Sequence, residues 1–186
     1  MNFFEKHKQA LIKVLIITAG VAALYFIVTK LFTRDRVLNN VLKAYELYST
    51  KDATREIEVY YGDPLSEGRK IYKARIFASK EIVNQIKQAV LFLLAPAPRN
   101  FVSYMPEGTS LREVFLDANK ICYLDFSKEL SLNSKGGTTG EYRLVFSIVN
   151  TVVKNFPEIA GVKILIEGRE VESLSGHIKI KGILKS

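Results

Sequence analysis

The stretch TTGEYRLVFSIVNTVVKNFP, residues 138–157, decides the fold predicted for the second half of the chain. Thr138 and Glu141 have the T-x-x-E spacing of a capping box, in which two side chains bond the backbone at the start of a helix. Pro157 cannot continue a helix. We therefore expect a helix from Thr138 that ends before Pro157. Its apolar side chains recur at spacings of three and four residues, the period of one buried face; they are Val145, Ile148, Val149, Val152 and Phe156.

The segments around this helix follow a period of two, which is typical of strands with one buried face. They are residues 112–117 and 121–126, joined by a turn at Ala118-Asn119, and residues 162–166, with 171–174 and 177–183 as weaker candidates. The polar, glycine-bearing stretch 131–139 is expected to be a loop. This half of the chain therefore predicts a hairpin, a helix and a returning strand.

The first half predicts the same order of elements without repeating the sequence. Residues 56–61 and 72–78 predict a hairpin, with turn-forming glycine and proline between them. Ser79 is the expected N-cap of a helix with apolar residues at helical spacing through Leu94, and Pro96 ends it. The order ββαββαβ predicts an α+β two-layer sandwich, with one mixed or antiparallel sheet and two amphipathic helices on one face.

A long apolar segment precedes this domain. Residues 11–32 (LIKVLIITAGVAALYFIVTKLF) carry no charge from Val14 to Thr29. As a helix the segment spans roughly the ~30 Å hydrocarbon layer of a bilayer. We expect an uncleaved signal anchor, a single transmembrane helix that contacts the lipid bilayer. Two alternatives stay open: a cleaved signal peptide, although no small-x-small site follows the run, and a buried core helix.

The chain is expected to divide into four parts. Residues 1–10 are a short basic tail, 11–32 the transmembrane helix, 33–53 a juxtamembrane amphipathic helix or linker, and 54–184 the folded domain. Lysine and arginine flank the apolar segment on both sides, so their distribution does not fix the orientation. A short tail ahead of a single span most often stays inside, which predicts an extracytoplasmic domain at the cell membrane.

The charge of the chain does not indicate nucleic-acid binding. The formal net charge is +8; residues 1–53 hold 8 Lys/Arg and 4 Asp/Glu, and residues 54–186 hold 19 and 15, so each part contributes half. The excess beside the apolar segment suits anionic lipid headgroups. The domain has both signs interspersed and lacks a G-x-x-G loop and an RNP-like aromatic pair, so nucleic acid is not an expected partner.

Residues suited to catalysis or metal binding are sparse. His7 and His177 are the only histidines and Cys122 the only cysteine, whereas a zinc site normally needs three or four ligands. Cys122 alternates with apolar strand residues, which favours a buried thiol. Asp117 and Asp125 lie at hairpin ends and are expected in turns or at strand edges more than as an acid/base pair. We therefore expect a non-enzymatic domain without a metal or other cofactor.

Five short motifs follow one another along the domain at a characteristic spacing. They are Met105–Leu111 (MPEGTSL), Cys122–Ser127 (CYLDFS), Ile148–Val152 (IVNTV), Asn155–Pro157 (NFP) and Leu174–His177 (LSGH). Together they resemble the core of the GerMN domain, the sporulation and spore germination domain, here in a single copy over residues 54–184. The first helix departs from the family pattern, because Leu93-Leu94-Ala95-Pro96 lacks a glycine that many relatives carry there.

The resemblance implies a non-enzymatic module of the cell envelope outside the membrane, with a compact core shared with ring-building motifs. We expect a scaffold or protein-assembly role in sporulation or spore germination, through an envelope protein partner or self-association. The alternative is a peptidoglycan- or glycan-binding module, in which exposed tyrosines stack on sugar rings.

Four residues are candidates for an interface with a partner. Asn150 and Thr151 belong to the family motif, and Tyr142 and Tyr104 are tyrosines expected at the surface. For Asn150 and Thr151 the alternative is hydrogen bonding to a neighbouring loop or strand end inside the domain, because buried amides and hydroxyls need partners.

Overall fold

The structure is a computed structural model of the chain, and it describes residues 18–23, 53–66 and 68–186. Contacts divide the chain into two units, residues 1–40 and 41–186. In the first unit, residues 18–23 are helical. Within the described ranges no helix has both the length and the apolar character needed to cross a bilayer. The rest of the apolar segment and most of the juxtamembrane segment lie outside the described residues, so both remain predictions.

The described part of the second unit follows the predicted order of hairpin, helix, hairpin, helix and strand. Its elements are β1 (Thr54–Gly62), β2 (Arg69–Phe77), α2 (Ile82–Leu94), β3 (Leu111–Leu116), β4 (Ile121–Phe126), α3 (Glu129–Leu132), α4 (Gly137–Val153), β5 (Gly161–Ile166) and β6 (Arg169–Glu170). The short helix α3 was not predicted, and its last two residues fall within the predicted loop 131–139. The mixed α+β class is therefore confirmed.

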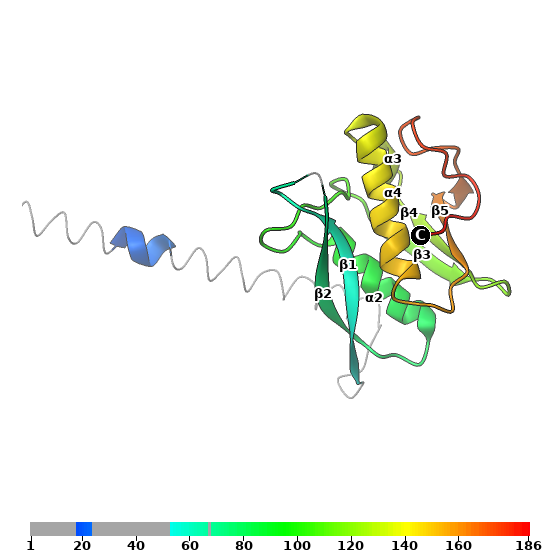
Figure 1. The fold of residues 1–186 in the computed structure, drawn as a ribbon, viewed down its shortest axis with the longest axis horizontal. Coiled ribbons are helices and arrows are strands. Elements are labelled where there is room, and N and C mark those ends of the chain that lie inside the picture. Colours follow the sequence, from blue (N-terminus) through cyan, green and yellow to red (C-terminus); the bar gives the residue numbers. More distant parts are fainter. Residues whose placement is uncertain (1–17, 24–52, 67) are drawn as a thin grey trace, which may run out of the picture. The chain divides into compact units, whose positions relative to one another are not determined.

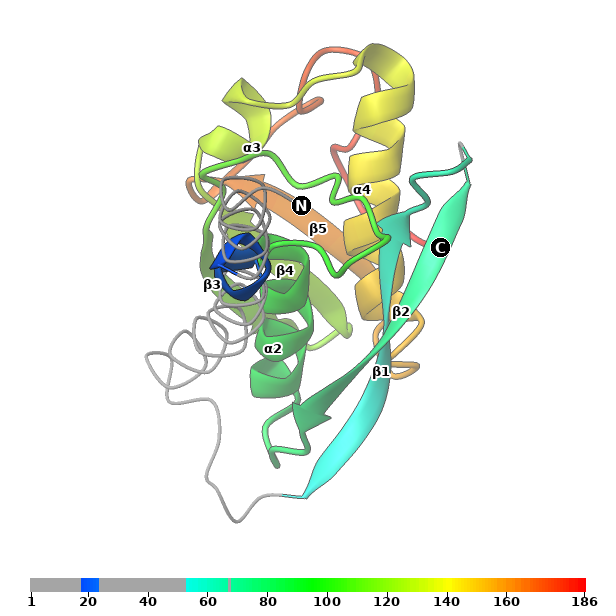
Figure 2. The ribbon, with the colours of Figure 1, turned by 90° about the vertical axis from the view of Figure 1, so that its left-hand side faces the viewer.

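The strands form two sheets, so the prediction of a single sheet is wrong. β1 and β2 pair with each other, and the second sheet has the order β3-β4-β5-β6. In this larger sheet β4 and β5 are parallel, because α4 returns the chain to the end at which β4 began. α2 and α4 each contact both the hairpin and the larger sheet. Figures 1 and 2 show the two helices between them.

Polar side chains of α4 and the turn after it occupy the edge of β1 that would otherwise pair with a strand. The Ser147 hydroxyl donates to the Tyr60 carbonyl, and the Tyr60 N–H donates to Thr151 Oγ1 at 3.1 Å. Asn155 accepts the Glu58 N–H at 2.8 Å and donates to the Glu58 carbonyl at 2.6 Å. Because these three side chains are spaced by four residues, they line one helix face and satisfy the strand backbone. The hairpin therefore stays separate from the larger sheet.

The predicted apolar faces of both helices form the core. The most buried positions, none more than 3% exposed, are Ile86, Ala89, Val90 and Leu93 of α2, Ile148, Val149 and Val152 of α4, and Phe156 after it. Cys122 of β4 is also fully buried, and its desolvation raises the pKa of the thiol to about 12. The predicted buried thiol is therefore confirmed.

The predicted N-terminal caps of both helices are wrong. The N-cap of α2 is Glu81, whereas Ser79 lies before it and accepts the Glu81 N–H at 3.3 Å. α4 begins at Gly137, preceded by Gly136 in the left-handed conformation. Thr138 therefore lies within the first turn and forms no capping box, since the carboxylate of Glu141 is engaged elsewhere.

The chain after β6 does not form the predicted strands. Residues 171–174 and 177–183 lack strand structure, and Leu184 makes only an isolated bridge to Val162 of β5. Four backbone N–H groups between residues 174 and 178 donate instead to the carboxylate of Glu141, as described below. A carboxylate on α4 thus replaces a neighbouring strand as their acceptor.

Candidate functional site

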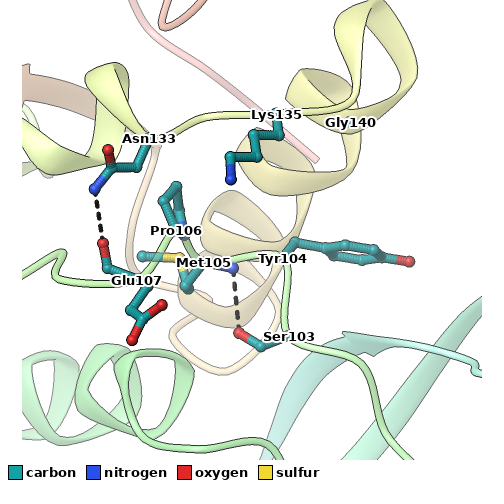
Figure 3. A pocket seen from close by; sticks show the side chains of 8 residues that line it. All are labelled: Ser103, Tyr104, Met105, Pro106, Glu107, Asn133, Lys135 and Gly140. Atoms are coloured by element: carbon teal, nitrogen blue, oxygen red, sulfur yellow. Dashed lines mark hydrogen bonds between the residues drawn. The ribbon is translucent and has the colours of Figure 1, made fainter.

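A surface hollow lies where the loop before β3 faces the start of α4 (Figure 3), and we call it the 104 pocket. Its volume is about 470 Å³. The loop contributes one wall and the segment between α3 and α4 contributes the other. The lining residues are Ser103, Tyr104, Met105, Pro106, Glu107, Asn133, Lys135 and Gly140. The 104 pocket thus includes Tyr104, one of the predicted interface residues, and the start of the MPEGTSL motif.

A tight turn holds the loop wall of the 104 pocket. The Thr109 N–H donates to the Pro106 carbonyl at 3.3 Å, and Gly108 has a φ of 83°. A positive φ at the third turn position is typical of a type II turn and favours glycine there. The Asn133 amide donates to the Glu107 carbonyl at 2.9 Å and ties this turn to the end of α3 (Figure 3). The P-E-G-T part of the motif therefore has a structural role.

The 104 pocket carries groups suited to binding. Its charged side chains are Glu107 and Lys135, accompanied by the hydroxyl of Ser103 and the amide of Asn133. Its lining contains no histidine or cysteine. Across the described ranges, no cluster of three or more His, Cys, Asp or Glu side chains could hold a metal ion.

An exposed aromatic pair lies on the second sheet. Phe115 of β3 is opposite Tyr123 of β4, and their rings stack with centroids 4.4 Å apart and planes 9° from parallel. Phe115 is 44% exposed, whereas Leu124, the next residue of β4, is fully buried. Side chains alternate between the two faces of a strand, so the pair lies on the face opposite the helices. We call Phe115 and Tyr123 the aromatic pair.

Charged residues of both signs lie near the aromatic pair. Lys163 of β5 lies 5.7 Å from the Tyr123 ring and forms an ion pair with Glu170. The Tyr123 hydroxyl reaches Asp117 at 3.4 Å. Because both charge signs are present and the two rings stack on each other, this face lacks the basic character expected of a nucleic-acid platform.

A buried carboxylate holds the C-terminal segment. Glu141 is fully buried and accepts the backbone N–H groups of Leu174 at 2.6 Å, Ser175 at 3.1 Å, His177 at 2.9 Å and Ile178 at 3.2 Å. The Ser175 hydroxyl donates to it as well, at 2.9 Å. Burial acts to raise the pKa of Glu141, but these donors outweigh it and hold the pKa below its ordinary value. The LSGH motif therefore surrounds the carboxylate of Glu141, which holds this segment in place.

Both predicted hairpin aspartates accept hydrogen bonds from turns, Asp117 within a turn and Asp125 from strand β4. Asp125 is 7% exposed and accepts the Gly168 N–H at 2.7 Å. Glu167 and Gly168 have φ values of 51° and 78°, as in the two-residue type I′ turns that join strands. Asp117 accepts the Asn119 N–H at 2.9 Å in the turn between β3 and β4. The prediction that these residues serve turns, and not an acid/base pair, agrees with their contacts.

The structure buries two of the predicted interface residues. Thr151 and Asn150 are both fully buried. Thr151 accepts the Tyr60 N–H, and Asn150 donates to the Phe146 carbonyl at 2.9 Å. The Oδ1 atom of Asn150 has no hydrogen-bond partner within the described part of the chain. Their burial favours the alternative interpretation, internal hydrogen bonding, over direct contact with a neighbouring subunit.

The two predicted tyrosines lie at separate hollows. Tyr104 lines the 104 pocket, and its ring packs so closely over Gly62 that a β-carbon there would lie 2.5 Å from the hydroxyl. Tyr142 is 49% exposed and lines a second hollow of about 330 Å³ with Arg69 and Phe146. The structure does not bring the four residues into one surface. Contact of Tyr104 and Tyr142 with a partner stays a prediction.

Sequence reasoning missed the aromatic pair and the role of Glu141. The aromatic pair could have been found by aligning residues 112–117 with 121–126 across their turn, because that register places Phe115 opposite Tyr123. No local pattern identifies Glu141 as an anchor, since its partners begin 33 residues further along the chain. The spacing between Thr138 and Glu141 matches a capping box, which is a commoner role for a glutamate at this position.

The comparisons with known proteins agree on one family. A family model named Germane, described as sporulation and spore germination, matches residues 58–172. The chain is similar to the first GerMN domain of the sporulation protein GerM from Bacillus subtilis, with 22% identity, 71% of this chain and 97% of that chain covered, and a TM-score of 0.55. The tandem GerMN domains of GerM give 22% identity, coverage of 70% and 46%, and a TM-score of 0.53. No curated protein matches the chain. The predicted resemblance to a single GerMN domain is confirmed.

Proposed function

The chain belongs to the Germane family of sporulation and spore germination domains, and from this premise we propose that it is a non-enzymatic assembly domain of the cell envelope. Residues 11–32 anchor it in the membrane as a signal anchor, and the domain lies outside the cytoplasm. Its partner is another envelope protein or a second copy of the chain. It acts as a scaffold in sporulation or spore germination.

The observation that carries the assembly role is the exposed aromatic pair. Aromatic side chains are enriched at the centres of protein interfaces, where a few of them supply most of the binding energy. Stacking on Tyr123 holds the Phe115 ring in place, so little side-chain freedom is lost when a partner covers it. The ion pair of Lys163 and Glu170 beside it resembles the polar surroundings of such centres.

Replacing Phe115 with alanine is expected to weaken assembly while the domain stays folded. Truncating a central aromatic anchor typically costs about 2 kcal/mol of binding free energy, which is roughly a thirtyfold loss of affinity. The measurement is chemical crosslinking of the full-length chain in its native membrane, with quantification of crosslinked partner or dimer. Circular dichroism melting of the purified variant checks the fold.

Leu132→Ala is the matched control, because Leu132 is a 71% exposed apolar residue on α3 and not on a strand of the larger sheet. Equal crosslinking by wild type and Phe115→Ala would remove this face from the interface. A wild-type chain that crosslinks to neither a partner nor itself would remove the assembly role.

Maleimide labelling tests the location of the domain. In a Ser186→Cys variant the introduced thiol lies at the exposed C-terminal residue, whereas the native Cys122 is fully buried. Because burial raises the pKa of the Cys122 thiol to about 12, wild-type protein is expected to stay unlabelled at pH 7.5 until it is denatured. Labelling of Ser186→Cys in intact cells by an impermeant maleimide supports an extracytoplasmic domain. Labelling only after lysis contradicts it.

A further inference from the structure

We propose that the open edge of β2 binds an extended acidic segment of a partner protein by strand addition, an inference that rests on the assembly role and names a surface for it. The edge belongs to the hairpin, on the far side from α4. Figure 1 shows β1 between β2 and α4, with β2 on the outside. We call the backbone groups of Arg69, Ile71, Lys73 and Arg75 the β2 edge.

The register of the hairpin fixes which β2 groups face outward. Glu58 and Tyr60 direct their backbone groups toward α4, and they are opposite Lys73 and Ile71. Directly opposite residues of an antiparallel pair either bond each other or both face away. Lys73 and Ile71 therefore face away from β1. Phe77 confirms the pattern, since its N–H and carbonyl bond the side chain of Gln88 on α2 at 2.8 and 3.0 Å.

The β2 edge is free of hydrogen bonds in the described part of the chain. At one end of the strand, the backbone of Phe77 is satisfied by the side chain of Gln88. Beyond Phe77, no hydrogen bond joins the outward N–H and carbonyl groups of Ile71, Lys73 and Arg75 to another described residue. Such a row of unpaired groups is a ready template for an added strand.

The side chains along the β2 edge are basic. β2 reads RKIYKARIF and contains no acidic residue. Arg69, Ile71, Lys73 and Arg75 are all exposed residues, and Ile71 is 47% exposed. The guanidinium of Arg69 lies 4.1 Å over the Phe146 ring of α4, so Lys73 and Arg75 are the basic side chains available to an added strand. Lys73 pairs with Glu56 of β1 at 2.9 Å. A strand added at the edge of β2 that faces away from β1 would place every second side chain next to the side chains of the β2 edge.

The chain itself shows which side chains complement β2. In the hairpin, β1 sets Glu56 opposite Arg75, Glu58 opposite Lys73 and Tyr60 opposite Ile71. An antiparallel partner on the free side meets the same β2 residues in the same order. The pattern expected of the partner is therefore acidic-x-acidic-x-aromatic, because opposite charges and aromatic–aliphatic pairs stabilise cross-strand neighbours.

A second copy of β2 fits this edge poorly. Antiparallel pairing of two β2 strands would bring the lysine and arginine side chains of one copy beside those of the other, and like charges directly opposite destabilise a sheet. Basic side chains on an edge are also a known protection against such pairing. Charge therefore favours an acidic partner over self-association at this edge.

A labelled peptide tests the proposal directly on the full-length chain in detergent micelles. The probe is the fluorescein-labelled peptide TVEVEVYVT, and the charge-reversed peptide TVKVKVYVT is its control. We expect saturable binding of the acidic peptide by fluorescence anisotropy, and binding at least about tenfold weaker for the basic one. In hydrogen exchange followed by NMR, the peptide is expected to slow the amides of Ile71, Lys73 and Arg75. The amides of Lys70 and Ala74, which face β1, are expected to change little.

Two substitutions at one position separate the backbone from the side chain. Ile71→Pro removes an N–H that no described residue uses, and proline is tolerated on strand edges when its position faces outward. This variant is expected to lose at least about tenfold in peptide affinity, because a ladder donor is gone. Ile71→Ala keeps the N–H and is expected to bind within about threefold of wild type.

The outcomes distinguish this proposal from the assembly role. No binding of the acidic peptide, equal binding of both peptides, or equal affinity of Ile71→Pro and Ile71→Ala would overturn strand addition. If Phe115→Ala loses a crosslinked partner while the acidic peptide does not bind, the assembly role stands and the β2 edge is merely a protected one. If the peptide protects alternate amides but wild type crosslinks to nothing in the membrane, the edge chemistry stands and the assembly role falls.

Discussion

Replacing Glu141 with alanine is expected to destabilise the domain by about 3 kcal/mol, the effect of leaving several buried donors without an acceptor. The carboxylate accepts four backbone N–H groups and a hydroxyl from residues 174–178. No other described acceptor is positioned to replace it, since this region forms no strand. Urea denaturation of the full-length chain followed by far-UV circular dichroism measures the free energy of unfolding.

Glu158→Ala is the control for Glu141→Ala, because Glu158 is an exposed glutamate in the turn after α4. It is expected to leave the free energy of unfolding within about 0.5 kcal/mol of wild type. Comparable destabilisation by the two substitutions would mean that the buried hydrogen bonds of Glu141 do not account for the loss of unfolding free energy.

The effect of Glu141 is also expected to depend on pH. Its donors hold its folded-state pKa below the ordinary value of 4.5. A group with a lowered folded pKa contributes stability that is present above the unfolded pKa and is lost as pH falls through the folded pKa. The difference in unfolding free energy between wild type and Glu141→Gln should therefore be full at pH 7 and shrink below pH 4.5. A difference that stays constant to pH 3 would contradict the charge of Glu141 as its cause.

Local periodicity predicted the elements of this domain because each depends on neighbouring residues. The apolar spacing of α2 and its proline stop predicted the helix and its end near Leu94, although not its N-cap, and alternation located both hairpins. The position of Asp117 in a turn followed from its place at a hairpin end, and its contacts with Asn119 and Ile121 are local. The turn that Asp125 supports lies 43 residues further along the chain. Local patterns therefore predict the elements whose own contacts are local.

Local patterns could not predict contacts between residues that are far apart in the sequence. Whether β1 pairs with a strand or with side chains depends on residues near 90 positions later, since Tyr60 meets Thr151 and Glu58 meets Asn155. The single sheet was the simplest arrangement of the predicted elements, and these polar residues on α4 and in the turn after it replaced one of its pairings. Glu141 is a similar case, in which a capping motif in the sequence serves another segment.

The motifs that indicated the family are mostly structural. Asp125 and Gly108 each serve a turn, and Thr151 supports β1. The LSGH segment donates its backbone N–H groups to the buried carboxylate of Glu141. Of the features that carry the functional proposals, Tyr123 belongs to the CYLDFS motif, whereas Phe115 and the β2 edge lie outside the motifs. A family match of this kind therefore identifies the fold more directly than it identifies a partner.

Replacing Asn155 with alanine is expected to detach β1 from α4 and to destabilise the domain by about 2 to 3 kcal/mol, since both backbone groups of one strand residue lose their partner. Asn155 accepts the Glu58 N–H at 2.8 Å and donates to the Glu58 carbonyl at 2.6 Å. Urea denaturation of the full-length chain gives the free energy, and hydrogen exchange gives the location. The Glu58 amide is expected to exchange faster, while the Tyr60 amide stays protected by Thr151.

The matched control for Asn155→Ala is Asn133→Ala. Asn133 is exposed and makes one hydrogen bond to a backbone carbonyl, that of Glu107, so its loss is expected to cost less than about 1 kcal/mol. Unchanged exchange at Glu58 in Asn155→Ala would show that water or another group replaces the amide at no cost. The expected result instead ties the position of the whole hairpin, and with it the β2 edge, to a side chain that follows α4. An assembly surface on β2 is then held in place by the N-F-P motif, which gives that motif a function at a distance from the surface it supports.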